Sequence, residues 1–233
     1  MTIAGLQKMT LLDYPGKVAC TVFLQGCNFR CPFCHNSGLL QGPAEDEISL
    51  DSLLHFLDRR KGLLDGVCVT GGEPTLQRDL PHLLRQIKER GFLVKLDTNG
   101  SRPEVIKALA EEGLLDYVAM DVKNGPLRYA ETVGCTAPQA ALEESLSFLF
   151  TAGVDYELRT TVVRELHDET SILDMGRWLT SLSPDGRVKR LFLQFFTDRD
   201  SVLQAGLTPP DREEMERYQA ILAPFAEQIF IRG

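Results

Sequence analysis

The sequence lacks any apolar run that approaches the roughly 20 residues needed to cross a membrane. It has no excess of basic residues, since its formal net charge is −8, and this argues against a broad nucleic-acid or anionic-membrane surface. Residues 1–17 contain no charged segment followed by an apolar run, so we expect no secretory signal. From these absences we predict a cytoplasmic protein with neither a nucleic-acid partner nor a membrane partner.

The chain also lacks low-complexity tracts, short repeats and an obvious linker. Its 233 residues are enough to bury a sizeable core. We therefore expect a single domain over residues 1–233.

Cysteines are few, and their placement does not suit a disulfide framework. Three of the six lie within residues 27–34, whereas Cys20, Cys68 and Cys135 are scattered. A disulfide-rich secreted domain would be shorter and more evenly crosslinked. Cys20 and Cys68 lie within apolar runs, so we expect them in the core. The cluster of three indicates a cytosolic protein with a cysteine-ligated metal site.

What the sequence does contain is a regular alternation of strand-like and helix-like segments. The first two strands are expected at residues 18–24 and 66–70, and Ser49 suits the N-cap of the helix between them. Such alternation predicts parallel strands with right-handed crossovers. Further strands are expected at 92–96, 117–120, 155–163, 190–196 and 228–232, and further helices at 79–90, 101–113, 142–150, 170–181 and from 208 onward.

Polar segments, four of which contain glycine, follow the ends of five predicted strands. They lie at residues 25–35, 71–74, 97–100, 121–125 and 197–200. Both a doubly wound open sheet and a complete or partial barrel fit the alternation. Strand ends converge on one face in a βα barrel, so five contributions to one site favour the curved sheet. We predict an α/β fold built as a partial (β/α)6 TIM-like barrel, with parallel strands and outer helices.

The first candidate site is the Cys-x3-Cys-x2-Cys loop of Cys27, Cys31 and Cys34, directly after the first strand. Three thiolates in so short a loop can reach one metal centre, and iron–sulfur clusters favour cysteine thiolate at each iron. Three protein ligands leave one iron open for a substrate or cofactor. The alternative is a zinc site with His35 as fourth ligand. Structural zinc usually takes two separated ligand pairs, and this sequence offers no second pair.

A second candidate is Gly-Gly-Glu-Pro at residues 71–74, directly after the second strand. Gly71 and Gly72 would let a ligand approach the backbone closely, and Glu73 offers an acceptor for an ammonium group. The simpler interpretation is a tight turn between strand and helix.

Polar side chains also mark the next three strands. Asp97 and Asn99 could hold a ribose hydroxyl or merely form an Asx turn. Asp121 and Lys123 lie at i and i+2, so they face the same side of a strand and could pair or share a ligand. Arg159 lies inside a strand-like run. If it faces the interior it needs an anionic partner, such as the carboxylate of a ligand, and if it faces outward it is a solvated charge.

Together these motifs resemble the radical S-adenosylmethionine (SAM) superfamily. The resemblance is carried by the cysteine loop, with Phe33 before its last cysteine, and by Gly-Gly-Glu-Pro after the second strand. Cys-Pro-Phe-Cys-His-Asn at residues 31–36 and the polar residues at 97–99, 121–123 and 159 resemble activases of glycyl radical enzymes. Residues 8–17 and 25–30 are most similar to activating proteins of anaerobic ribonucleoside-triphosphate reductase.

This resemblance implies a [4Fe–4S] cluster on the three cysteines, with the fourth iron binding the methionine part of SAM. Gly71, Gly72 and Glu73 would contact the amino group, and Arg159 would be the partner of the carboxylate. A larger set of residues would contact the rest of the cofactor: Phe33, Asp97, Asn99, Asp121 and Lys123.

The implied reaction starts when the reduced cluster breaks a C–S bond of SAM. The 5′-deoxyadenosyl radical would then abstract hydrogen from a backbone glycine of a partner glycyl radical enzyme, expected to be anaerobic ribonucleotide reductase. A flavodoxin or ferredoxin-type protein would be the reductant. We expect the partner to dock across the strand carboxyl ends, on a surface that includes residues 13–16 and 196–200.

Two positions depart from the family pattern. Residues 13–16 read Asp-Tyr-Pro-Gly rather than Asp-Gly-Pro-Gly, and Phe195 ends the sixth strand where pyruvate formate-lyase activases have a histidine. No cysteine-rich insertion lies between Cys34 and Gly66, so we expect no auxiliary cluster domain.

Three alternatives to this function stay open. One is an activase of another glycyl radical enzyme, of the pyruvate formate-lyase type. Another is a radical SAM enzyme that acts on a small molecule. The third is a non-enzymatic metal-binding module, although such a module has no need of the Gly-Gly-Glu-Pro turn.

Overall fold

The computed structural model describes residues 1–40, 47–198 and 201–233. These residues divide into two compact units, which are described separately. Unit 1 comprises residues 1–28, 38–98 and 104–119, and unit 2 comprises residues 29–37, 99–103 and 120–233. The expected single domain stays a prediction.

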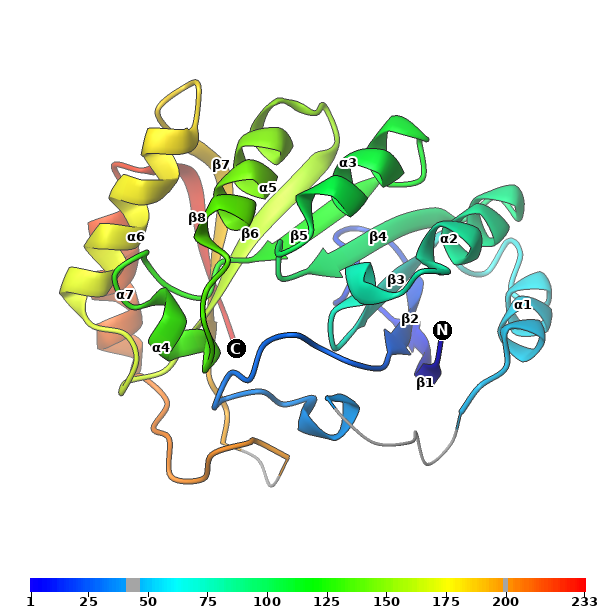
Figure 1. Ribbon diagram of the computed structural model, residues 1–233, viewed down its shortest axis with the longest axis horizontal. Helices are drawn as coiled ribbons and strands as arrows, with labels where there is room; N and C mark the ends of the chain where they lie inside the picture. The colour runs from blue at the N-terminus through cyan, green and yellow to red at the C-terminus, as the bar shows by residue number, and fades with distance from the viewer. Residues whose placement is uncertain (41–46, 199–200) are drawn as a thin grey trace. The chain divides into compact units, whose positions relative to one another are not determined.

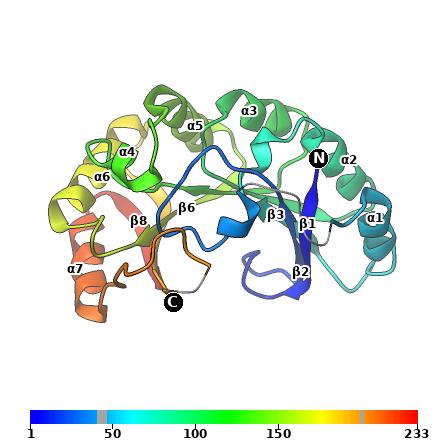
Figure 2. The ribbon, with the colours of Figure 1, turned by 60° about the horizontal axis from the view of Figure 1, so that its bottom comes forward.

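Unit 1 alternates strands and helices, as the apolar periodicity predicts (Figure 1). Strand β2 pairs in parallel with β3, and β3 pairs in parallel with β4. Its helices lie along one face of these strands (Figure 2), where the buried Leu53, Leu57, Leu80 and Leu83 seal the core. The elements are β1 (Ile3–Thr10), β2 (Ala19–Leu24), α1 (Leu50–Asp58), β3 (Gly66–Gly71), α2 (Leu80–Glu89), β4 (Leu93–Thr98) and α3 (Pro103–Glu111), with the last helix starting at the unit boundary.

Unit 2 repeats the same plan. Strand β6 pairs in parallel with β7, and β7 with β8. Leu158, Leu191 and Leu193 are buried almost completely, together with Met175 and Leu179 of the helix between β6 and β7. The elements are α4 (Tyr129–Val133), α5 (Gln139–Thr151), β6 (Asp155–Val162), α6 (Glu169–Leu182), β7 (Val188–Phe195), α7 (Arg212–Leu222) and β8 (Ala226–Arg232).

Strand β5 (Tyr117–Asp121) has residues in both units, and the sheet order of the described residues follows chain order from β1 to β8. The predicted α/β class with outer helices is confirmed. The sheet of the described residues has eight strands, namely the seven expected from the sequence and β1. Strand β1 was not predicted, and it is antiparallel to β2. Its register is irregular at two places, and only its two end residues are buried, so it shows no clean alternation.

Several helix ends agree with the expectations from the sequence. Ser49 caps α1, as expected, by accepting from the N–H of Ser52 at 3.1 Å. The last helix, expected from residue 208 onward, begins at Arg212 after the cap Asp211, which forms a reciprocal pair with Glu214. Cys20 and Cys68 are fully buried, as expected. Among the described residues, no helix combines the length and apolarity required to span a membrane.

Candidate functional site

In unit 1 a glycine turn follows β3. Gly71 pairs with Leu24 at the end of β2, and the N–H of Gly72 donates to the carbonyl oxygen of Leu24 at 2.9 Å. The N–H of Glu73 donates to the carbonyl oxygen of Gly26 at 2.7 Å. A Cβ atom at position 71 would lie 2.2 Å from the oxygen of Leu24, and one at position 72 would lie 2.1 Å from that of Gly26. Only glycine lets this turn approach the segment that leads into the cysteine loop.

The Glu73 carboxylate is held rigidly behind that turn. Its side chain is buried, and one oxygen, Oε1, accepts from the N–H and the hydroxyl of Thr75 at 3.1 and 2.6 Å. The same oxygen accepts from the hydroxyl of Thr98 at 2.8 Å. Hydroxyl and N–H donors thus fix the orientation of this buried carboxylate.

Replacing Gly72 by alanine is expected to destabilise the protein. The added methyl must push apart two backbone segments, which costs roughly 2–3 kcal/mol in a packed interior. Gly38→Ala is the matched control, because a Cβ at position 38 meets nothing within 4 Å. Urea denaturation of the cluster-free proteins measures both. Equal stability of the two variants would show that the close approach does not constrain the turn.

Lys95 is a charged residue that belongs to none of the sequence motifs. It lies on β4 with only 1% of its side chain exposed, and its ammonium group forms an ion pair with Asp97. The ammonium nitrogen also lies 3.9 Å from the Cys68 sulfur. A buried cation of this kind is tolerated only with a paired anion. The carboxylate of Asp97, which is expected to contact a ribose, therefore also compensates the buried charge of Lys95.

In unit 2 three charged side chains meet where the end of β5 lies beside β6. Asp121 Oδ1 accepts from Arg159 Nε at 2.8 Å, and Asp121 Oδ2 accepts from Lys123 Nζ at 2.9 Å. We call these three residues the charge triad. Arg159 is 14% exposed and therefore faces inward, with Asp121 as the anionic partner that its position demands. Two cations against one carboxylate leave the triad with a net positive charge, which suits an anionic ligand.

The triad keeps its charges over the whole physiological pH range. Burial alone would raise the pKa of Asp121, but the charges of Arg159 and Lys123 outweigh burial and lower this pKa to about 2. Burial opposes the charge on Lys123 as well, and the neighbouring Asp121 carboxylate nevertheless raises the pKa of Lys123 above its ordinary value. The Lys123 ammonium also lies 6.0 Å from the centroid of the Phe33 ring. These contacts link the triad to the cysteine loop within unit 2.

Of the two interpretations of Asn99, a ribose contact or an Asx turn, the structure shows the Asx turn. Its side chain is buried in unit 2, and its Oδ1 accepts from the N–H of Ser101 at 2.9 Å. This is the geometry of an Asx turn. The contact of Asn99 with a cofactor stays a prediction.

The part of the cysteine loop in unit 2 is braced by the segment after β7. His35 Nε2 lies 2.7 Å from the carbonyl oxygen of Thr197, and the His35 ring stacks on Phe196 with centroids 5.6 Å apart. The N–H of Gln204 donates to the carbonyl oxygen of Pro32 at 2.9 Å. Residues 196–198 of the expected docking segment therefore lie beside the cysteine loop. Residues 199–200 of that segment fall outside the described residues.

The other expected docking segment, residues 13–16, is at the wrong end of the strands. Thr10 pairs with Ala19, so residues 11–18 connect β1 to the amino end of β2, whereas Cys27 follows its carboxyl end. Tyr14 packs against Ala19 and Tyr117, both at strand starts. The prediction failed because the antiparallel β1, which forms a hairpin with β2, was not expected.

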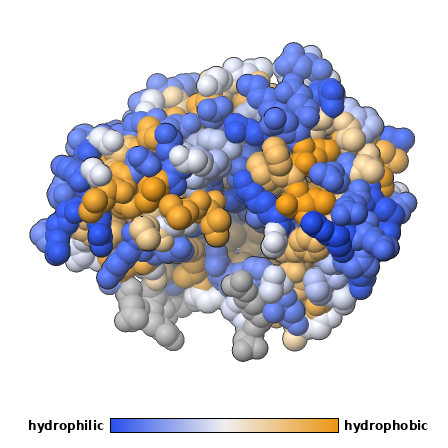
Figure 3. All heavy atoms as spheres, turned by 180° about the vertical axis from the view of Figure 1, so that it is seen from behind, coloured by the Kyte–Doolittle hydropathy of each residue, from blue (hydrophilic) through white to orange (hydrophobic). Residues whose placement is uncertain are grey.

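The connection between β1 and β2 also exposes apolar side chains. Figure 3 shows apolar patches among hydrophilic side chains on one face of the molecule. Leu11 is well exposed and Leu12 is 85% exposed, and Met9 near the end of β1 is exposed beside them in the chain.

The donor set fits an iron–sulfur cluster by its chemistry. Cys27 lies in unit 1, while Cys31 and Cys34 lie in unit 2. All six cysteines belong to the described residues and are reduced thiols. Within residues 1–40, 47–198 and 201–233, no three His, Cys, Asp or Glu side chains are grouped as ready metal ligands. The ligand set therefore rests on three thiols within eight residues, which is the donor type that cubane clusters take.

The sequence matches a known protein family and several curated proteins. The family model of the radical SAM superfamily matches residues 21–175. Among curated relatives, a candidate glycyl-radical enzyme activating enzyme of Methanocaldococcus jannaschii is 37% identical over 184 residues, which cover 75% of this chain and 74% of the relative. Pyruvate formate-lyase 1-activating enzyme of Escherichia coli K12 is 26% identical over 248 residues, with 97% of both chains covered.

Solved structures share the fold. SuiB of Streptococcus suis, in its crystal structure with bound SAM, matches with a TM-score of 0.68 at 14% identity over 91% of this chain. The match covers 51% of SuiB, so this chain spans about half its length. A domain of pyruvate-formate lyase-activating enzyme from Bacteroides vulgatus matches with a TM-score of 0.54 at 20% identity, over 70% of this chain and 98% of that one.

The fold and the family match define the class: the chain belongs to the radical SAM superfamily, whose cofactors are a [4Fe–4S] cluster and SAM. Within that superfamily it is a glycyl-radical enzyme activating enzyme.

Proposed function

We propose that this protein reductively cleaves SAM and installs a glycyl radical on a partner enzyme. The observation that carries the proposal is the 37% identity with a candidate activating enzyme over three quarters of the chain. When bound, the [4Fe–4S] cluster supplies the electron that breaks a C–S bond of SAM to give methionine and the 5′-deoxyadenosyl radical. The chain's own residues have to bind SAM, orient it and exclude water.

In this proposal two groups of residues recognise the amino-acid part of SAM. The Gly71–Gly72 turn and the buried Glu73 carboxylate would contact the amino group of methionine. The charge triad, with its net positive charge, would bind the methionine carboxylate. Opposite charges for the two ends of one amino acid are what recognition of SAM requires.

Further contacts of the SAM site stay within the proposal. Phe33 would lie near the adenine, and Asp97 and Asn99 would lie near the ribose. Cys27, Cys31 and Cys34 would hold the cluster.

The partner is a glycyl radical enzyme, and two kinds are candidates. Relatives from Escherichia coli and Clostridium pasteurianum are named as activators of pyruvate formate-lyase, which favours a partner of that type. The resemblance of residues 8–17 and 25–30 to activators of anaerobic ribonucleotide reductase favours the second. We place the reaction in the cytoplasm, with a flavodoxin or ferredoxin-type reductant.

The test uses the reduced, cluster-loaded protein with SAM and each glycyl radical enzyme of its organism in turn. Electron paramagnetic resonance should detect a glycyl radical doublet with one of them. A doublet on a pyruvate formate-lyase type enzyme supports the first partner, and a doublet on the reductase supports the second. Cleavage of SAM without a radical on any of these enzymes would overturn the proposal in favour of a small-molecule substrate.

A further inference from the structure

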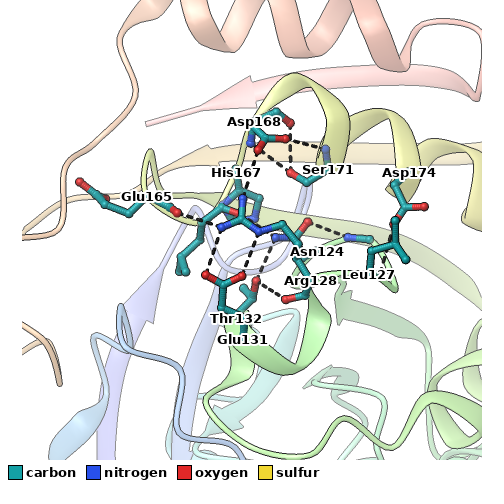
Figure 4. Close-up of polar contacts among 12 residues, drawn as sticks. Asn124, Leu127, Arg128, Glu131, Thr132, Glu165, His167, Asp168, Ser171 and Asp174 are labelled. Carbon is teal, nitrogen blue, oxygen red and sulfur yellow. Dashed lines mark hydrogen bonds and ion pairs between the residues drawn. The ribbon is translucent and has the colours of Figure 1, made fainter.

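A polar network around the buried Asn124 and His167 lies in unit 2 (Figure 4). Asn124 follows β5 and is fully buried. Its amide nitrogen donates to the hydroxyl of Thr132 at 2.9 Å and to the carbonyl oxygen of Leu166 at 2.8 Å. Its amide oxygen accepts from the N–H of Gly125 at 2.8 Å. The chain that leaves β5 is therefore anchored to α4 and to the loop before α6.

His167 anchors Lys123, the residue that precedes Asn124 in the chain. The His167 ring is 1% exposed, and its Nε2 lies 2.8 Å from the carbonyl oxygen of Lys123. A carbonyl oxygen only accepts, so Nε2 carries the hydrogen. The N–H of Val163 points at Nδ1 from 3.1 Å, so Nδ1 accepts. These two contacts assign the neutral tautomer with its hydrogen on Nε2, although Nδ1 also lies 3.1 Å from the carbonyl oxygen of Val163.

The surroundings of His167 favour its neutral form. Burial lowers the pKa of His167, and the nearby Arg128 lowers it further, against the opposite effects of two backbone carbonyls and Asp168. From the α7 side, the hydroxyl of Tyr218 donates to the carbonyl oxygen of His167 at 3.2 Å. Charge on this ring would be poorly compensated.

The contacts form a continuous path from His167 to the triad. The backbone of Val122 is held by β6, since its N–H donates to the carbonyl oxygen of Arg159 at 2.8 Å and its carbonyl accepts from Thr160. Beyond Val122, the carbonyl of Lys123 is held by His167. The side chain of the same lysine carries the ammonium group that bonds Asp121 at 2.9 Å.

We propose that His167 is a positioning residue for the SAM site, which holds the Lys123 carbonyl with a neutral imidazole and so aims Lys123 and Asp121 at the cofactor. This inference rests on the proposed function, because it takes the charge triad as part of the SAM site. A leucine at position 167 has no donor for the carbonyl, and the lysine side chain can then turn away from the ligand. A glutamine can place an N–H donor near the position of Nε2.

The first test concerns the tautomer and needs neither cluster nor activity. The chain has four histidines, so long-range proton–nitrogen NMR of the ¹⁵N-histidine-labelled, cluster-free protein resolves each ring, and His167→Gln assigns the signal. We expect the neutral Nε2–H pattern for His167, unchanged between pH about 6 and 8. An Nδ1–H pattern, or a change of pattern within this pH range, would overturn the assignment.

The second test measures SAM binding to the oxidised, cluster-loaded protein, which binds SAM without cleaving it. His167→Leu should weaken binding about tenfold, and His167→Gln should stay within about threefold of wild type, because one hydrogen bond that positions a charged side chain is at stake. His55→Leu, on the exposed face of α1, is the control and should bind normally. Unchanged binding by His167→Leu at equal iron content would overturn the proposal.

Arg159→Leu, measured in parallel, separates the two proposals. If Arg159→Leu binds SAM weakly and His167→Leu binds it normally, the positioning role fails and the site stands. If both variants bind normally, the placement of the charge triad in the SAM site is wrong, and the positioning role fails with it. A variant that loses thermal stability but binds SAM normally would assign His167 to structure alone.

Discussion

Alanine substitution of Cys27, Cys31 or Cys34 is expected to remove the iron–sulfur cluster and all SAM cleavage. Each thiolate is expected to hold one iron, and two thiolates do not retain a cubane cluster that already has one open iron. The wild-type protein, reconstituted without oxygen, should contain about four irons per chain, and each variant should contain almost none. Iron analysis and visible absorption before and after addition of SAM measure the difference.

Cys135→Ala is the matched control for these variants, because Cys135 lies in the loop between α4 and α5, away from the motif in sequence. It should keep its iron and its activity. Alanine at the fully buried Cys20 or Cys68 should keep the cluster too, at some cost in stability. One zinc per chain in protein purified without oxygen would instead favour the zinc interpretation.

Arg159→Leu is expected to weaken SAM binding by about 10- to 100-fold, roughly 1.4–3 kcal/mol, since a charge-assisted hydrogen bond to the ligand is lost. The change also leaves Asp121 paired with Lys123 alone, which removes the net positive charge of the triad. Calorimetric titration of the oxidised protein with SAM measures the affinity.

Arg187→Leu is the control for this variant. Arg187 precedes β7, where its guanidinium donates to the carbonyl oxygens of Ala223 and Ala226, so it belongs to the opposite end of that strand from Phe195. The control should bind SAM like the wild type. Equal affinities for Arg159→Leu and Arg187→Leu would remove Arg159 from the SAM site.

The sequence predicts most of the fold because its signals are local and mutually consistent. Apolar runs mark β2 and β3. Ser49 and Asp211 precede helices, where their side-chain oxygens accept from N–H groups of the first turn. The parallel order then follows from alternation and handedness rules rather than from any single residue. Strand β1 could not be predicted in this way. Its register is irregular, and bulges interrupt the alternation of buried and exposed side chains on which strand prediction depends.

In the candidate site, too, some residues can be predicted from the sequence and others cannot. The cysteine loop, the glycine turn and the Asp121–Lys123 pair can be predicted because their partners are neighbours in sequence. His167 could not be found, since it acts on the carbonyl of a residue 44 positions earlier. The burial of Lys95 was not predicted for another reason. A lysine inside a strand is usually exposed, and only the fold shows that this one is buried.

The central claim is that the radical made from SAM takes a hydrogen atom from a backbone glycine of a protein partner. The direct measurement uses a partner enzyme labelled with glycine deuterated at its α carbon, mixed with the reduced, cluster-loaded protein and SAM. The account predicts 5′-deoxyadenosine that carries one deuterium, formed together with a glycyl radical on the partner. Unlabelled 5′-deoxyadenosine and no radical on any glycyl radical enzyme of the organism would contradict it.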